Sequence, residues 1–342
     1  MTDSPAVRPG YGPLWWLLGG SALLSVIIVG WHVFQSAQRA AAQQGDGKDP
    51  KTYGFELAGI TSGELRASGL PRDGLIVLDE PATITAKDND ALPDHKKIVV
   101  SSDRVIGIVG PDGGARAYPL RLMTWHAVVN DRVGGRNVAV VYDPLCDAAV
   151  AFERGEGETA REFGYSGLVL NGQFLMYDRA GESLWSPLLG QAVSGRDRGR
   201  FLSPVFLELT TWGDWRRRNP ETTVLSPIRS HRKRYKRATY GLYRGVEALP
   251  FPVTPFPPPE PRSPWDRMIV VVSGEGRLDA FALSEIAEKA GEDGDYRFEG
   301  EGRKVHFVHD PASGTVRVNR PGEGVAVMYG FWFAVHAARS YR

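Results

Sequence analysis

The most reactive side chains are one histidine and the only cysteine of the chain. His126 lies in the segment 124–131, and Cys146 ends the string Tyr-Asp-Pro-Leu-Cys at 142–146. An imidazole can activate a thiol as a nucleophile, and a neighbouring Asn or Asp can orient the ring. The sequence therefore predicts a catalytic site whose candidates are His126, Cys146 and Asp131. The alternative is structural, with a backbone-bonded histidine at the core margin and a buried, inert thiol.

The same segment contains groups that suit a soft metal ion. Imidazole, thiolate and thioether groups are ligands for copper or zinc. A mixed set of this kind would consist of His126, Asp143, Cys146 and Met176. No spacing within the set is typical of a zinc site, so copper or zinc stands as a candidate cofactor beside the inert-thiol alternative.

Tyr, Trp, Asn and Asp residues are concentrated between positions 130 and 185. Aromatic faces and polar tips of this kind can stack on and hydrogen-bond a small polar ligand. The candidate ligand-binding residues are Asn130, Tyr142, Tyr165, Asn171, Tyr177, Asp178 and Trp185. The alternative interpretation is a turn at Asp178 and core packing of Trp185.

Several short motifs follow one another in a fixed order. They are AYPL at 117–120, a WH-VND-GG pattern at 125–135, YDPLC at 142–146, the Phe-to-Asn segment 163–171, MYDR at 176–179, SLW at 183–185, a Gly-Ala-Gly pattern at 190–195 and FWFA at 331–334. Together this series resembles the bacterial and archaeal family called domain of unknown function 3179, over residues 75–342. The resemblance implies no established activity.

One position departs from the family pattern. The family usually has Cys-Pro-Leu-Cys where this chain has Asp143-Pro144-Leu145-Cys146. Two thiols at that spacing could form a redox disulfide, whereas Asp143 and Cys146 cannot. The departure favours a member that has lost the family's chemistry.

The N-terminal region has membrane character. After a short tail at 1–13, residues 14–34 form an uncharged apolar run with tryptophans near its ends. That length can span a bilayer, and it exceeds the apolar region of a cleavable signal peptide. We expect a single-pass anchor in the cytoplasmic membrane, a flexible stalk at 35–53, and a globular domain on the extracytoplasmic, periplasmic side.

Alternating apolar and β-branched segments dominate the rest of the chain. We expect strands at 76–78, 97–100, 105–109, 137–142, 148–152 and 173–177, and helices at 121–130, 211–219 and 283–289. This pattern predicts an α+β fold that is β-dominated and largely antiparallel. The expected organisation is a main domain at 54–249, a Pro-rich linker at 250–264 and a second β-rich sub-domain at 265–342.

Two stretches of the chain are similar to later ones. Residues 105–120 are echoed by 269–283 at an offset of 163, and 141–144 by 308–311 at an offset of 167. The near-constant offset predicts two related sub-domains. The alternative is that two hairpins of similar chemistry converge on similar strings.

Charge narrows the choice of partners. The formal net charge is +1, which provides no field that would attract nucleic acid. A basic run at 229–237 is either a solvated loop or a contact for anionic lipid headgroups. Three functions stay open for a membrane-anchored extracytoplasmic protein: a metal-binding or redox-associated protein at the cell envelope, a non-catalytic module that binds a small molecule or protein, or a Cys-dependent hydrolase or transferase.

Overall fold

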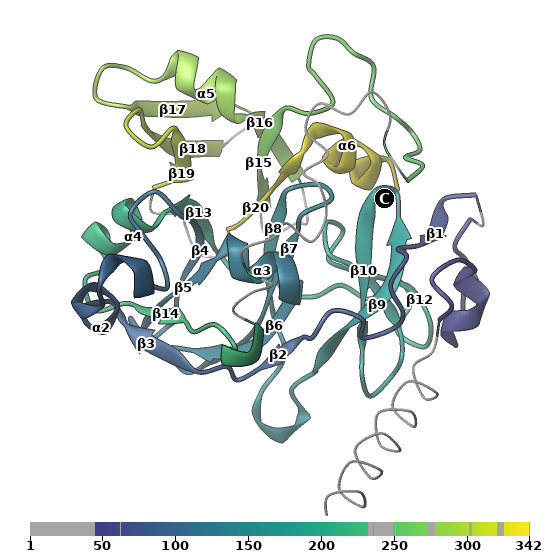
Figure 1. Cartoon of the computed structure of the whole chain (residues 1–342). Helices are drawn as coiled ribbons and strands as arrows, with labels where there is room; N and C mark the ends of the chain where they lie inside the picture. Colours follow the sequence, from purple (N-terminus) through teal and green to yellow (C-terminus); the bar gives the residue numbers. More distant parts are fainter. Residues whose placement is uncertain are drawn as a thin grey trace, which may run out of the picture. The chain divides into compact units, whose positions relative to one another are not determined.

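The computed structural model describes residues 45–61, 63–231, 235, 249, 251–272, 278–300, 303–319 and 325–341. Within these ranges the fold is mostly β, with antiparallel and mixed sheets and a few short helices, which agrees with the expected α+β class (Figure 1). No helix in these ranges is long and apolar enough to cross a membrane. The predicted anchor at 14–34 lies outside the described residues.

The central layer is a seven-stranded sheet, sheet B, in the order β16-β15-β20-β8-β7-β6-β2. Its strands are β2 (Leu78–Asp79), β6 (Val128–Val133), β7 (Arg136–Asp143), β8 (Ala148–Glu153), β15 (Arg267–Val272), β16 (Leu278–Ala282) and β20 (Ala326–Phe331). Along β7, Ala139 and Val141 enter a first core, whereas Val138 and Val140 enter a second. Successive side chains of a strand point to opposite faces, so sheet B is buried on both sides.

Sheet A covers one face of sheet B. Its strands are β1 (Leu65–Ala67), β9 (Phe163–Leu170), β10 (Gln173–Asp178), β11 (Leu184–Ser186) and β12 (Gln191–Ser194), paired antiparallel in the order β1-β9-β10-β11-β12. The first core lies between the two sheets and includes Cys146, Phe163 and Trp185. Helix α6 (Trp332–Tyr341) is drawn in yellow in Figure 1. Its residue Phe333 also belongs to this core.

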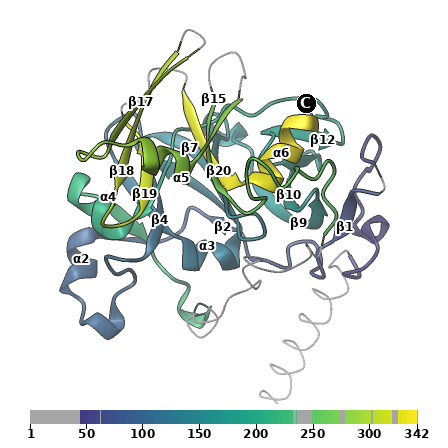
Figure 2. The same ribbon diagram turned by 90° about the horizontal axis from the view of Figure 1, so that it is seen from above.

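Sheets C and D pack against the other face of sheet B. Sheet C contains β3 (Thr83–Thr85), β4 (Arg104–Val109), β5 (Ala115–Pro119), β13 (Glu208–Thr211) and β14 (Thr223–Leu225), and sheet D contains β17 (Asp295–Gly300), β18 (Arg303–Asp310) and β19 (Thr315–Val318). The second core joins Ile106 of sheet C, Val140 of sheet B and Phe307 of sheet D. Figure 2 shows sheet D and helix α5 (Leu283–Lys289) as a separate small layer beside β20.

Short helices close the edges of these layers. They are α2 (Ala86–Ala91), α3 (Leu120–His126), α4 (Trp212–Arg218) and α5 (Leu283–Lys289), with 3-10 helices η1 (Pro50–Tyr53), η2 (Asp94–Lys96), η3 (Gly157–Thr159) and η4 (Arg229–His231). Trp212 and Trp215 of α4 pack on the outer face of sheet C. Gly107 makes this packing possible, because a Cβ there would lie 2.3 Å from the Trp215 ring.

Local structure agrees with the sequence prediction in some elements and differs in others. The predicted helix 283–289 coincides with α5, but the helix expected at 121–130 ends at His126. Ala127 has a φ of 59°, which breaks the helix, and the β-branched pair Val128 and Val129 then continues as strand β6. The segment expected as a strand at 97–100 is irregular instead.

The predicted boundaries differ from the observed packing in two places. Residues 45–53, expected as stalk, fold onto the domain: the Tyr53 ring is buried and its hydroxyl donates to the Leu70 carbonyl over 2.7 Å. In the predicted linker 250–264, Val253 packs on the first core and the Thr254 amide donates to Asn171 over 3.0 Å. The described residues from Gly45 onward form one compact unit. The predicted second sub-domain contributes β15, β16 and β20 to the same sheet as β6, β7 and β8.

The two echoing stretches occupy equivalent positions in the fold. Each forms a hairpin, a short helix and a three-stranded meander: β4-β5-α3-β6-β7-β8 in the first case and β15-β16-α5-β17-β18-β19 in the second. The hairpin registers match at the offset of 163, since Val105 pairs with Pro119 and Met268 pairs with Ala282. A later strand and helix complete each series, with β13 and α4 beside β4, and β20 and α6 beside β15.

The equivalence extends to individual hydrogen bonds. The Trp212 amide at the start of α4 donates to the Asp103 carbonyl, and the Trp332 amide at the start of α6 donates to the Asp266 carbonyl, both over 2.8 Å. The meanders are exchanged between the halves: β8 pairs with β20, and β19 lies beside β13 (Figure 1). The last meander strand of each series therefore lies beside a strand of the other series.

Candidate functional site

His126 is a buried structural side chain at the end of α3. Its Nδ1 lies 2.6 Å from the Ile76 carbonyl oxygen, and its Nε2 lies 2.8 Å from the Tyr235 hydroxyl. A carbonyl only accepts, so Nδ1–H donates and Nε2 accepts from the tyrosine. Burial lowers the pKa of His126, which favours the neutral ring. Both nitrogens are engaged, in agreement with the backbone-bonded alternative.

Cys146 lies in the first core beside Asp143 and has no exposed surface. The Asp143 carboxylate accepts from the Leu145 amide over 2.8 Å and from the Phe174 amide over 2.7 Å, and the Cys146 thiol is its third donor. Burial raises the pKa of Asp143 to about 7 and, together with the nearby Asp143 carboxylate, raises the pKa of the Cys146 thiol well above its usual value. The raised pKa keeps Cys146 as a protonated, enclosed thiol at neutral pH, whereas the thiolate is the form that acts as a nucleophile or metal ligand.

The predicted thiol–histidine site is not assembled. Tyr235, the partner of His126, packs in the second core, whereas Cys146 and Met176 pack in the first, on the opposite face of sheet B. Within the described ranges, no group of three or more His, Cys, Asp or Glu side chains is arranged to hold a metal ion. The set His126, Asp143, Cys146 and Met176 thus has no support as a metal centre in the described structure.

Asn130 and Asp131 lie on strand β6, and their side chains bond sheet B to sheets A and C instead of orienting His126. Asn130 donates to the Asp79 carboxylate and to the Phe163 carbonyl, both over 2.8 Å. On the other face, Asp131 accepts from Arg116 over 2.6 Å and from the Tyr118 hydroxyl over 2.7 Å. Because the helix ends at His126, these residues do not share its face.

The predicted polar and aromatic ligand surface is mostly core. Tyr165, Tyr177 and Trp185 are each at most 3% exposed. The Trp185 indole donates to Asp178 over 3.1 Å, and the Gly181 amide donates to the same carboxylate in the predicted turn. Tyr142 and Asn171, the other two predicted residues, are equally buried. Packing, the alternative interpretation, describes this set.

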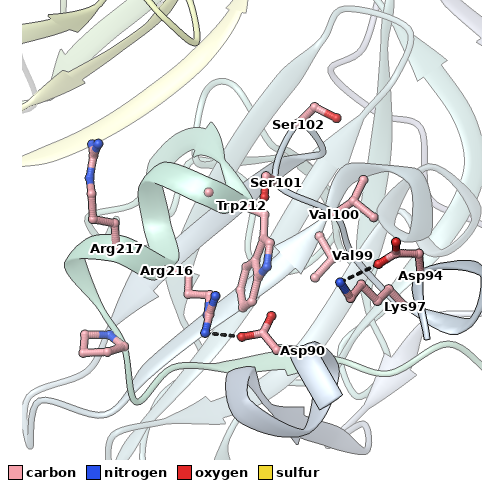
Figure 3. Close-up of a pocket in the computed structure, with 12 residues that line it drawn as sticks. Asp90, Asp94, Lys97, Val99, Val100, Ser101, Ser102, Trp212, Arg216 and Arg217 are labelled. Carbon is pink, nitrogen blue, oxygen red and sulfur yellow. Dashed lines mark hydrogen bonds and ion pairs between the residues drawn. The ribbon is translucent and has the colours of Figure 1, made fainter. Parts of the chain in front are cut away.

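An open hollow of about 730 Å³ lies instead on the outer side of sheet C (Figure 3). It is bordered by α2, η2, the segment 97–102 and α4, and its lining includes Asp90, Asp94, Lys97, Val100, Trp212 and Arg216. Its volume falls within the range of small-molecule sites. The lining combines charged groups with an apolar wall.

Strand pairing brings the walls of the hollow together. Thr211 of β13 pairs with Arg104 of β4, which places the start of α4 beside the turn 100–104. There the Gly213 amide donates to the Ser101 carbonyl over 2.9 Å. The opposite wall is held by the buried Asn89, which accepts from the Ile98 amide over 2.9 Å and donates to the Val99 carbonyl over 3.0 Å.

The charges of the hollow are paired, but weakly. Lys97 contacts Asp94 over 2.7 Å, and the Asp94 side chain is 92% exposed. Arg216 pairs with Asp90, and both side chains are partly exposed (Figure 3). Arg217 also lines the hollow. Exposed ion pairs contribute little free energy, so an incoming anion can replace a carboxylate at Lys97 or Arg216 at small cost.

The comparison with known families agrees with the motif series. The sequence profile described as "Protein of unknown function (DUF3179)" matches residues 72–337. The chain belongs to the DUF3179 family. No curated protein and no solved structure matches it.

Sequence reasoning missed the residues of the hollow and the buried Asp147. The hollow depends on pairing between β4 and β13, which are far apart in the sequence, and no local motif marks it. A signal in the sequence marks the two partners of Asp147. Asp-Arg occurs at 103–104 and again at 266–267, at the offset of 163, and both of these arginines contact Asp147. Of the basic run 229–237, residues 229–231 and 235 are described, and lipid contact by this run stays a prediction.

Proposed function

We propose that this DUF3179 protein is a non-catalytic binding module, held at the extracytoplasmic face of the cytoplasmic membrane by residues 14–34. Its ligand is a small molecule that carries an anionic group and an apolar part, and the hollow beside α4 receives it. The observation that carries the proposal is the 730 Å³ hollow, in which Lys97 and Arg216 are held by partly exposed ion pairs beside an apolar wall.

The chemistry of the lining defines the ligand class. Arg216 offers a planar fork of donors that matches a carboxylate or phosphate, and Lys97 adds a second positive charge. Val100 is 41% exposed and provides an apolar surface on the same wall. A ligand with both features would contact both parts of the lining.

A catalytic role draws less support from the described residues. The thiol of Cys146 is protonated and enclosed, and the nitrogens of His126 are bonded to Ile76 and Tyr235. Neither group is among the described residues that line the hollow, and none of these residues is a cysteine or histidine. Binding without covalent chemistry therefore fits the geometry better than a Cys-dependent hydrolase or a redox protein.

Phenyl phosphate is a suitable probe, because it joins a dianion to one aromatic ring. We expect calorimetric titration into the full-length chain to show saturable binding that is tighter than the binding of inorganic phosphate or phenol. Arg216→Gln should weaken the binding at least about tenfold, because it removes the charged fork. Arg297→Gln is the matched control, since Arg297 is a 74% exposed arginine on β17, outside the hollow. Equal binding in both variants, or no binding to the wild type, would refute the proposal.

A further inference from the structure

The two equivalent halves of the fold meet at a carboxylate that only one of them supplies. Arg104 and Arg267 are the first residues of β4 and β15, and both contact Asp147. Arg104 Nη1 and Nη2 lie 3.0 and 3.2 Å from the two Asp147 carboxylate oxygens, and Arg267 Nε lies 2.8 Å from Oδ2. The Tyr142 hydroxyl donates to Oδ1 over 2.8 Å. Asp147 is only 3% exposed, so this is a built, buried site.

The position equivalent to Asp147 is Gly314. The turns after β7 and β18 have the same form: the first aspartate accepts from the amide two residues later, Asp143 from Leu145 over 2.8 Å and Asp310 from Ala312 over 2.9 Å. Both turns end in the left-handed region, with φ of 50° at Asp147 and 64° at Gly314. The second half therefore has a hydrogen atom where the first has a carboxylate.

Open space lies on the Gly314 side of the arginine pair. A Cβ added to Gly314 would meet no atom of the described residues within 4 Å. A cavity of about 40 Å³ is lined there by Arg104, Asp147, Arg267, Gly314, Thr315 and Tyr329. One water needs roughly 10–15 Å³ of such space, so the cavity has room for a few water molecules or an ion of three or four heavy atoms. Among the described residues that line it, the charged ones are two arginines and one aspartate.

We propose that this cavity binds a small carboxylate-type anion, such as formate or bicarbonate, beside Gly314. The anion takes the place of the carboxylate that the second half lacks, and its two oxygens accept from the guanidinium groups of Arg104 and Arg267. Bound there, it links the starts of β4 and β15 and so stabilises the contact between the two halves. This site is separate from the hollow and too small for the ligand proposed there.

The test measures the melting temperature of the full-length chain in formate or gluconate at equal ionic strength, since gluconate is a carboxylate too large for the cavity. We expect formate to raise the melting temperature of the wild type saturably, by about 2–4 °C. Gly314→Asp supplies the missing carboxylate in a conformation that Asp147 itself adopts, so it should raise the melting temperature without formate and abolish the formate response. Gly113→Asp is the matched control, because Gly113 has a φ of 85° and open space around it in a turn outside the cavity; it should keep the wild-type response.

Gly314→Asn separates charge from volume. Asparagine also tolerates this backbone region and fills the cavity without a charge, so we expect it to lose the formate response without the gain in melting temperature. The proposal is overturned if formate and gluconate act alike on the wild type. It is also overturned if Gly314→Asp, or Gly314→Asn where the first does not fold, responds to formate as the wild type does.

Discussion

Asp143 stands where the resemblance to the DUF3179 family leads us to expect a second cysteine, and it is bonded as a structural carboxyl. Its oxygens accept from two backbone amides and one thiol inside the first core. The sequence offers the inert thiol as one of two alternatives, and the burial of Cys146 in the first core agrees with that alternative. The sequence could not show that His126 and Cys146 lie on opposite faces of sheet B. The face on which His126 lies depends on where helix α3 ends and strand β6 begins.

The pKa of Asp143 leads to a pH-dependent stability. Burial raises this pKa from 3.8 to about 7 in the folded chain, so the folded state binds a proton more tightly than the unfolded state. The stability that the folded state gains from this tighter proton binding is fully present below pH 4 and is lost as the pH rises toward 7. We expect the unfolding free energy of the wild type to fall by a few kcal/mol relative to Asp143→Asn between pH 4 and pH 8. Denaturant titrations across this range measure it, and parallel pH profiles for the two proteins would contradict the assignment.

Among the secondary-structure elements, the paired turns before β4 and β15 set the position of the following strands and helices. Asp103 accepts from the Val100 amide over 3.0 Å, and Asp266 accepts from the Ser263 amide over 3.1 Å. Sequence similarity identified the hairpins that follow, since their apolar pattern repeats. The turns themselves share only the Asp-Arg pair, so their equivalence emerged from the hydrogen bonds.

Equivalent turns should respond alike to mutation. Asp103→Ala and Asp266→Ala should each lower the unfolding free energy by about 1 kcal/mol, because each leaves a turn amide without its acceptor. Asp103→Asn and Asp266→Asn keep an acceptor oxygen and should cost less. Chemical denaturation of the four variants compares them. If only one of the two Asp→Ala substitutions lowered the unfolding free energy, the two turns would not be equivalent.

Across the whole molecule, strands of one series lie beside strands of the other, since β8 pairs with β20 and β19 lies beside β13. Composition and motif spacing do not reveal this arrangement. The sequence predicted the β-dominated class, the hairpins and helix α5, because these follow from local periodicity. It placed a boundary at 250–264 because prolines there exclude a central strand. Strands from both sides of that segment nevertheless share sheet B, a long-range pairing that no local pattern encodes.

This exchange predicts a single cooperative unfolding transition for residues 45–342. Phe307 of β18 is fully buried in the second core, which sheets B, C and D share. Phe307→Ala should lower the free energy of unfolding by about 3–5 kcal/mol, and one transition should be seen by both calorimetry and tryptophan fluorescence. If residues 265–342 unfolded as an independent unit, the variant would split the transition and leave the tryptophan signal of sheet A unchanged.

We propose that the ligand binds at the hollow beside α4, whereas the cysteine is part of the core. The most direct test is a calorimetric titration of phenyl phosphate into three full-length proteins, the wild type, Cys146→Ser and Arg216→Gln. We predict that Cys146→Ser binds as the wild type does, whereas Arg216→Gln binds at least about tenfold more weakly. Loss of binding in Cys146→Ser with full retention in Arg216→Gln would refute this proposal and would assign ligand binding to the thiol.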